Sequence, residues 1–214
     1  MKQTLFLLSF LFSTVIANGQ LVNSIGVKGG ISIANQEWDY KSIDSRIEKN
    51  NRTGIYSALS LEFFKSKNLS LITDIGFIEK GHKEDIEMTS ADSPESGPIK
   101  TFDTKFSYFE FVPMLKIRKE IGKLIPYALL GARLDYQLSH KSEIDYSALE
   151  KDFNKKIYGL TTGAGIEYKI KKIGINSEFQ YQHDFNKVLE NERLEVKNRS
   201  LIVSLGIKYD FNSK

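Results

Sequence analysis

The run Asn198-Arg-Ser-Leu-Ile-Val-Ser-Leu-Gly-Ile-Lys-Tyr-Asp-Phe211, close to the end of the chain, decides the fold class. Large apolar side chains occupy every second position from Leu201 to Phe211, and small or charged side chains occupy the positions between them. Successive side chains of a β-strand point to opposite faces, so this pattern predicts a strand with one apolar face and one small or charged face. We expect the large groups to point outward and the small groups inward.

The same alternation recurs along the chain. Between Lys156 and Ile170, apolar or aromatic side chains alternate with Gly159, Gly163 and Gly165, as expected where space inside a sheet is scarce. The runs that share this sense are 25–33, 55–63, 69–77, 108–118, 125–138, 156–170, 173–182 and 198–211. Together they predict an all-β fold, an eight-stranded antiparallel up-and-down β-barrel.

The gaps between these runs alternate between short and long. The short gaps are 65–68, 119–123 and 171–172, and the long ones are roughly 35–52, 83–103, 140–156 and 186–198. This rhythm is typical of outer-membrane barrels, which have short periplasmic turns, long external loops and aromatic girdles near the strand ends. The runs are also long enough to cross a membrane at a tilt, which takes about 9 to 11 residues. We therefore predict an integral outer-membrane location.

The first residues have the features of a secretory signal. A charged start at Lys2 precedes the apolar run Leu5–Ala17, and Gly19 is a small residue at a plausible cleavage site. We predict a signal peptide at 1–19 and a barrel domain at 20–214. The sequence has no cysteine, so neither a disulfide nor a lipidated cysteine is expected, and the net charge of +3 is too balanced to indicate nucleic-acid binding.

Four segments resemble the PorT-like outer-membrane β-barrel family of Bacteroidetes-type bacteria. They are Tyr108-Phe-Glu-Phe-Val-Pro-Met-Leu-Lys116, Pro126-Tyr-Ala-Leu-Leu-Gly-Ala-Arg133, Thr162-Gly-Ala-Gly-Ile-Glu-Tyr168 and Val203-Ser-Leu-Gly-Ile-Lys-Tyr-Asp-Phe211. The likeness is a fold-level pattern that extends over the chain beyond residue 19. It implies an outer-membrane barrel without an enzymatic site. The tail 212–214 departs from the usual ending on an aromatic residue.

Charged side chains on the inward-facing positions carry both signs. Eight strands leave an interior just wide enough for side chains, and an unpaired ion is costly there, so we predict a network of ion pairs rather than an open pore. The main candidates are Lys28, Glu110, Lys116, Arg133, Glu167 and Glu178, together with Glu62, Asp74 and Lys208. Glu110 is expected to pair with Lys116, Arg133 or Lys28.

Catalytic and cofactor motifs are weak. The glycines of 159–165 are not followed by the Gly-Lys-Ser/Thr of a phosphate loop. The three histidines, His82, His140 and His183, fall near the outer ends of predicted strands, where a His with Ser139, Ser142 and Asp184 would suit a lipid-modifying enzyme. Their spacing matches no metal site. We expect no enzyme activity and no cofactor.

The long loops are expected to carry whatever partner recognition exists. The segment 83–103 is acidic and is predicted to be a solvated, disordered loop, with a divalent-cation bridge to lipopolysaccharide as the alternative. Trp38 and Tyr40 are predicted to lie in the first loop, exposed at the membrane rim. Expected partners are outer-membrane lipid and lipopolysaccharide, the outer-membrane assembly machinery and an unidentified surface partner.

These patterns favour a barrel with a structural or surface-interaction role and without an open pore. Two alternatives stay open at this stage: an outer-membrane lipid-modifying enzyme that uses His140 or His183, and a soluble barrel that binds a small ligand. The soluble barrel would turn the apolar side chains of 201–207 inward, so the faces of that strand distinguish it.

Overall fold

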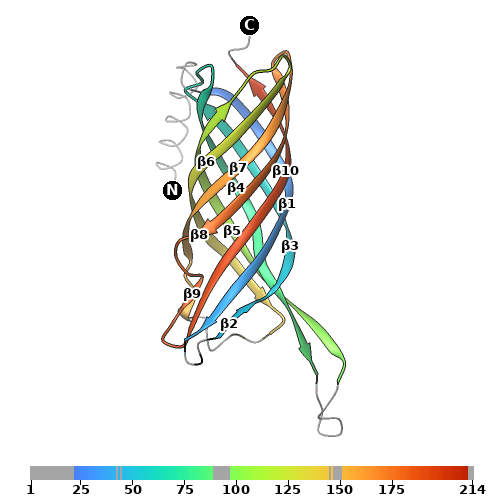
Figure 1. Ribbon diagram of the computed structural model, residues 1–214, viewed down its shortest axis with the longest axis vertical. Coiled ribbons are helices and arrows are strands. Elements are labelled where there is room, and N and C mark those ends of the chain that lie inside the picture. The colour runs from blue at the N-terminus through green and yellow to red at the C-terminus, as the bar shows by residue number, and fades with distance from the viewer. Residues whose placement is uncertain are drawn as a thin grey trace, which may run out of the picture.

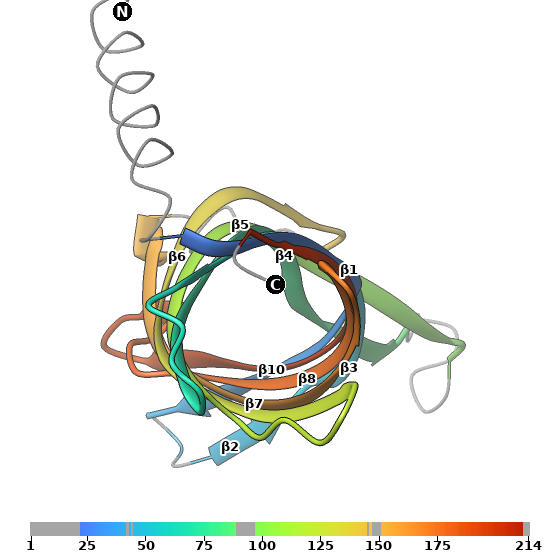
Figure 2. The same cartoon turned by 90° about the horizontal axis from the view of Figure 1, so that it is seen from above.

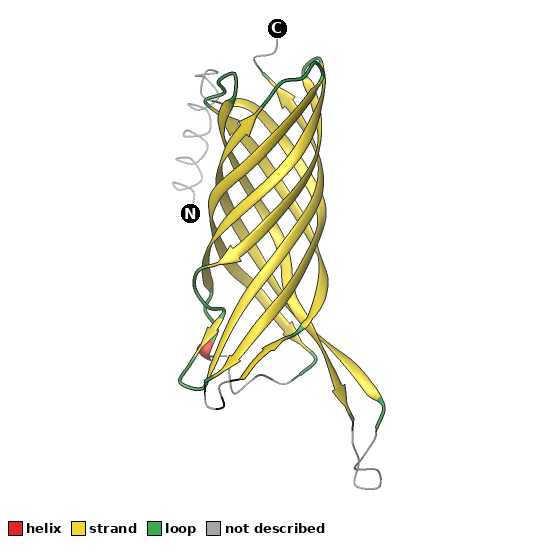
Figure 3. Ribbon diagram, in the orientation of Figure 1, coloured by secondary structure: helices red, strands yellow, loops and turns green. Residues whose placement is uncertain are grey.

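The computed structural model describes residues 22–41, 43, 45–88, 97–144, 146 and 151–211. These residues form one antiparallel sheet (Figures 1 and 3). Its ten strands are β1 (Val22–Tyr40), β2 (Ser45–Glu48), β3 (Asn50–Phe63), β4 (Leu69–Glu87), β5 (Ile99–Arg118), β6 (Leu124–Ser142), β7 (Lys156–Ile170), β8 (Ile173–Asp184), β9 (Leu189–Glu190) and β10 (Leu194–Asp210). In the described part of the chain, no helix is long and apolar enough to cross a membrane. The predicted signal peptide at 1–19 lies outside the described residues.

The sheet closes on itself. The long strands follow the order β1-β3-β4-β5-β6-β7-β8-β10, and β10 pairs back onto β1 from Ser24↔Asp210 to Tyr40↔Leu194. Figure 2 shows the resulting ring from above. The two short strands lie in segments that we expected to be loops: β2 pairs with the end of β1, and β9 pairs with the start of β10. The described chain thus has ten strands, two more than the eight expected, and both additional strands are short.

The side chains divide as the alternation predicts. Along β10, Ser200 and Ser204 are buried, whereas Leu205 is 67% exposed and Val203 is 43% exposed. Inside the ring the backbones come close to large side chains. A Cβ atom on Gly165 would lie 2.4 Å from the Tyr127 ring, so glycine is required at that position. The closed sheet therefore has an apolar outer surface and a polar interior over most of its length.

Toward the long-loop end the sense of the alternation reverses. On β1, Glu37 and Asp39 point outward and both form ion pairs with Arg46. Trp38 between them is 6% exposed and packs inside the ring. On β10, Val196 is buried and its neighbour Lys197 is exposed. Apolar inside and polar outside is the pattern of a sheet whose exterior meets water. The strands thus extend past the apolar band into solvent.

The long gaps are consequently shorter than expected. β1 reaches Tyr40, β4 reaches Glu87, and β5 already begins at Ile99. Of the segment predicted to be a disordered loop at 83–103, residues 83–87 and 99–103 are strand, and 89–96 lie outside the described residues. The expectation of disorder is wrong for those two strand segments.

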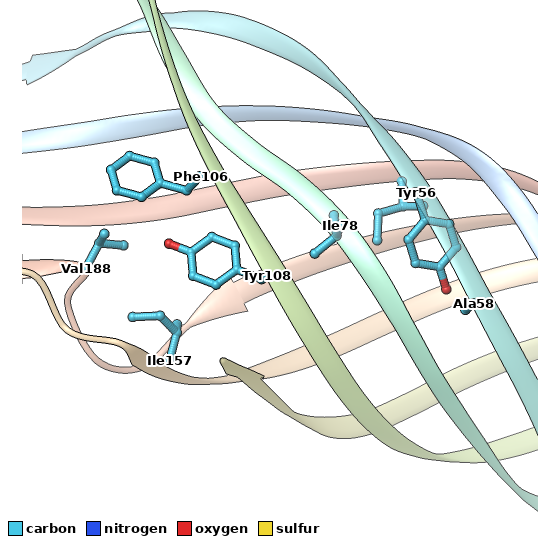
Figure 4. Packing of buried hydrophobic residues seen from close by; sticks show 8 residues of the cluster. Tyr56, Ala58, Ile78, Phe106, Tyr108, Ile157 and Val188 are labelled. Carbon is cyan, nitrogen blue, oxygen red and sulfur yellow. The ribbon is translucent and has the colours of Figure 1, made fainter. Parts of the chain in front are cut away.

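Apolar side chains also pack inside the ring. One cluster contains Tyr56, Ala58, Ile78, Phe106, Tyr108, Ile157, Val188 and Ile202. Figure 4 places Phe106, Tyr108, Ile157 and Val188 at one end of this cluster, and Tyr56 and Ala58 at the other. A second cluster contains Trp38, Leu189, Leu194 and Val196, with Tyr40, Tyr146 and Phe153 against it. These clusters close the interior toward the long-loop end.

Candidate functional site

The interior near the short turns is held by Glu62 on β3. Its carboxylate accepts a hydrogen bond from Arg118 at 2.5 Å and another from Lys208 at 3.0 Å. Lys208 also lies 3.0 Å from Glu167, which accepts a hydrogen bond from Lys116 at 3.2 Å. These five side chains come from four strands and link distant parts of the ring through one network of paired charges.

Lys28 organises the middle of the interior. Its ammonium group donates hydrogen bonds to Asp74 at 2.8 Å and to Glu178 at 2.9 Å. Glu178 also accepts a hydrogen bond from the Tyr127 hydroxyl at 2.9 Å. Beside this group, a cavity bordered by Lys28, Glu62 and Tyr127 has room for about one water molecule. Side chains therefore fill this part of the ring.

A third group lies closer to the long-loop end. Lys80 donates a hydrogen bond to Asp135 at 2.7 Å, and Arg133 lies 3.2 Å from Asp135 and forms an ion pair with Asp184. Lys80 and Asp184 were not predicted from the sequence as members of this network. Their inward parity on the strands 69–87 and 173–184 is the signal that could have indicated them.

Glu110 is buried in the interior but differs from the expected arrangement. It accepts a hydrogen bond from the Gln182 side-chain amide at 3.1 Å and has no ion pair among the described residues. Lys116, Arg133 and Lys28, the three partners predicted for it, bind Glu167, Asp184 and Asp74 instead. Strand register explains the difference, because the β5–β6 pairing sets Glu110 opposite the carboxylate of Asp135.

The interior beyond the apolar band is aromatic, and we call this part the aromatic cap: Trp38, His82, Phe106, His140, Tyr146 and Phe153. Trp38 lies within it, so the expectation of an exposed Trp at the rim is wrong. Its indole N–H donates to Gln36 at 3.2 Å. The expectation failed because β1 continues six residues past Ala34, with Trp38 on its inward side.

The three histidines occupy two environments, because His82 and His140 lie in the aromatic cap and His183 lies on the outer face. His82 is 1% exposed, with its ring centroid 5.5 Å from that of Trp38. His140 stacks on Phe106 at a centroid distance of 4.4 Å, whereas His183 is exposed on the outer face beside Phe185. Burial, together with the charges of Lys49 and His140, lowers the pKa of His82 to about 4.

The residues proposed for a lipid-modifying site do not converge. Asp184 binds Arg133, and the Ser142 hydroxyl lies 2.8 Å from that of Thr104. His183 faces the exterior while His140 faces the interior, so these side chains form no Ser-His-acid triad in the described structure. Nor does the described chain contain a group of three or more His, Cys, Asp or Glu side chains that could hold a metal ion.

A hairpin projects from the long-loop end of the ring (Figure 1). β4 and β5 stay paired to Glu87↔Ile99, but the pairing of β4 with β3 stops at Lys83 and that of β5 with β6 stops at Thr104. We call the segments 84–88 and 97–103 the projecting hairpin. Its exposed apolar side chains include Ile99, 72% exposed, and Met88, 46% exposed. It is fixed at its base by Asn50, which donates to Asp85 at 2.8 Å.

Comparison with known proteins identifies the class. A family model described as outer membrane protein beta-barrel domain matches residues 19–190, and the chain belongs to that family. The crystal structure of the outer membrane protein OprG from Pseudomonas aeruginosa is similar, with a TM-score of 0.56 and 12% identity over 90% of this chain and 98% of that one. AlkL, solved by solid-state NMR in lipid bilayers, has a TM-score of 0.50 and 13% identity over 91% and 93% of the two chains. A search of curated proteins gave no match.

These likenesses establish the location and the fold, not the activity. The protein is an integral outer-membrane β-barrel protein, so the soluble alternative is wrong. The apolar outer face of β10 agrees with this location. The outer membrane protease OmpT from Escherichia coli also matches, with a TM-score of 0.49 and 10% identity over 91% of this chain and 98% of that one.

Proposed function

We propose that this protein is a closed barrel of eight transmembrane strands, with short turns in the periplasm, that acts through its outer surface. The projecting hairpin carries this proposal, because a two-stranded ribbon beyond the barrel wall gains little stability by itself. Within the broader family, the strands at 108–116 and 126–133 support the PorT-like branch.

The filled interior supports the absence of an open pore. Lys28, Lys80 and Lys208 each bind carboxylates inside the barrel. The aromatic cap lies in the interior beyond the apolar band, on the long-loop side of these ion pairs. A solute would have to separate several buried ion pairs and displace aromatic rings to pass. We infer a structural plug, and no catalytic role for the histidines.

The projecting hairpin has the properties of a protein-binding edge. Asp103 still exchanges hydrogen bonds with Glu143, but beyond Lys83 on β4 and Asp103 on β5 the backbone edges have no neighbouring strand among the described residues. Unpaired edges favour addition of an extended segment from a partner, with main-chain hydrogen bonds supplying affinity. Ile99 and Met88 provide exposed apolar contacts next to those edges. The supported function is recognition of an extended protein segment at the cell surface.

Two further contacts belong to the proposal. Tyr209 lies near the end of β10 and Phe211 directly follows that strand, with their ring centroids 5.6 Å apart, and this aromatic end suits recognition by the outer-membrane assembly machinery. The exterior of the barrel contacts outer-membrane lipid, with lipopolysaccharide in the external leaflet.

Site-specific photo-crosslinking in living cells tests the surface role. A photoreactive residue at Ile99 should give a discrete crosslinked species, and the same residue at exposed Lys156 on the barrel wall serves as the control. Equal crosslinking from both positions, or from neither, contradicts recognition by the hairpin. In parallel, purified protein in planar bilayers should give no stepwise conductance, and stable channel openings would contradict the closed barrel.

A further inference from the structure

The short turns are strongly basic. The described residues of the three turns and their flanks include Lys65, Lys67, Lys119, Lys123, Lys169, Lys171 and Lys172, and the acids there are Glu120 and Asp210. Asp210 is 2% exposed and already binds Lys65 at 3.3 Å and Lys169 at 3.5 Å. Lys67, Lys119 and Lys123 are exposed and have no ion pair in the described part of the chain. This end of the barrel therefore presents uncompensated positive charge.

Apolar side chains are exposed at the same turns. Phe64 is 64% exposed beside the first turn, Ile121 is 57% exposed in the second, and Ile170 and Ile173 are 46% and 41% exposed around the third. A lysine lets its apolar stem lie along hydrocarbon while its ammonium group reaches the polar layer. The turns are thus built to rest in the membrane interface, with their ammonium groups at the depth of the lipid headgroups.

The outer end of the barrel has a different charge pattern. Acids lie among the cations there: Arg199 binds Glu37 at 2.6 Å, and Lys105 binds Glu79 at 3.0 Å. Lys187 likewise binds Glu190 at 2.7 Å. Exposed lysines without an ion pair among the described residues, such as Lys141 and Lys197, also occur at this end, but acids such as Glu143 and Glu195 lie two residues away from them. The outer end thus has mixed charge, whereas the short turns have many lysines and few acids, and this difference indicates that the basic turns are specific to one membrane surface.

We propose that the short-turn end is a docking ring for the anionic headgroups of glycerophospholipids, bound by Lys67, Lys119, Lys123 and Lys172. The apolar side chains between these lysines favour a lipid over a soluble polyanion, because they anchor the ring in the hydrocarbon edge where the lipid phosphates lie. Lys172 is held at the wall, with its ammonium group 5.9 Å from the centre of the Tyr209 ring. Assignment of the ring to the inner leaflet rests on the proposed orientation, with the short turns in the periplasm.

The test uses the full barrel in symmetric phosphatidylcholine vesicles that contain a minor fraction of phosphatidylglycerol. Spin-labelled lipids report which headgroup is immobilised at the protein surface. We expect the wild type to prefer phosphatidylglycerol over phosphatidylcholine by about threefold, because lysines near a membrane surface attract anionic lipid. The preference should weaken at about 1 M salt, where the Debye length falls to about 3 Å.

Two matched variants locate the effect. The variant Lys67→Gln, Lys119→Gln, Lys123→Gln, Lys172→Gln should lose the preference, while Lys141→Gln, Lys155→Gln, Lys156→Gln, Lys197→Gln at the outer end should keep it. Equal preference in both variants overturns the proposal. Lysine-dependent sedimentation with isolated peptidoglycan, without any lipid preference, also overturns it. Because the vesicles are symmetric, the lipid preference does not depend on the proposed orientation or on the role of the projecting hairpin. Surface protease digestion of whole cells tests the orientation separately, and crosslinking tests the hairpin.

Discussion

Glu110 lies directly opposite Asp135 in the β5–β6 pairing, and both carboxyl groups are buried in the barrel interior. The two carboxyl groups differ in the number of cations and hydrogen-bond donors that contact them. Asp135 contacts Lys80 at 2.7 Å and Arg133 at 3.2 Å, whereas Glu110 receives one hydrogen bond, from Gln182, and its Oε1 atom has no hydrogen-bond partner among the described residues. Of the carboxylates proposed from the sequence, Glu110 is therefore the one whose charge is least compensated.

The first prediction follows from this inequality. Glu110→Gln keeps the shape and an acceptor for Gln182, so the free energy of unfolding should change by less than about 1 kcal/mol. Glu178→Gln removes one of the two carboxylates that contact Lys28, and should cost about 1.5 to 3 kcal/mol because Asp74 alone then compensates the buried cation. Urea unfolding in detergent measures both. Equal losses would show that Glu110 carries a compensated charge.

The second prediction concerns the membrane-facing surface. Leu205 is 67% exposed on the apolar face of β10, so Leu205→Arg should lower the free energy of unfolding in lipid by about 2 to 4 kcal/mol. Thr53→Arg, at an exposed position of β3 opposite Ile33 at the edge of the apolar band, is the control and should cost less than about 1 kcal/mol. Equal tolerance of the two arginines in liposome unfolding experiments would mean that Leu205 does not meet lipid.

The third prediction is a pH dependence of the aromatic cap. The pKa of His82 falls from its ordinary 6.5 to about 4 in the folded protein, chiefly through burial. Between these two pH values the unfolded state binds a proton at His82 that the folded state does not bind. The contribution of His82 to the free energy of unfolding is therefore fully present above pH 6.5 and is lost as the pH falls from 6.5 to about 4. The loss should reach about 3 kcal/mol, at 1.36 kcal/mol for each pH unit.

Trp38 reports this change directly, because it is the single tryptophan of the chain and its ring lies 5.5 Å from that of His82. Wild-type fluorescence should shift as the cap loosens in acid, and His82→Phe should abolish the shift between these pH values. The exposed His183→Phe variant should behave as the wild type. A shift that persists in His82→Phe would assign the titration to another group.

The fourth prediction tests the close packing of the interior. A methyl group on Gly165 would lie 2.4 Å from the Tyr127 ring, so Gly165→Ala should destabilise the barrel by about 1 to 3 kcal/mol. Gly29 has nothing within 4 Å of the same added atom, and Gly29→Ala should change stability by less than about 0.5 kcal/mol. Heat-modifiable gel migration gives the folded fraction of each variant, and similar losses would argue against the crowding.

The alternation along Leu201–Phe211 predicted the outward and inward faces of β10, and similar runs predicted the all-β class and the outer-membrane location. This information is local, because each strand residue points away from its neighbours whatever the rest of the chain does. The inward placement of Lys28, Glu110 and Arg133 follows from the same local rule. Their partners do not follow from this local rule, because Lys28 and Glu178 lie 150 residues apart in the sequence and are brought together by the register of the strands.

Tertiary structure also decided where the strands end. The sequence predicted loops from 35 and from 83, whereas β1 continues to Tyr40 and β4 to Glu87. On β1 the period of two continues with its sense reversed. Lipid surrounds the barrel up to that level and water surrounds it above, so Glu37 turns outward and Trp38 turns inward. By itself the sequence determined which residues share a face. The register between strands decided which inward charges meet, because it brings together residues that are far apart in the chain. The solvent around each segment decided where the aromatic cap and the projecting hairpin begin.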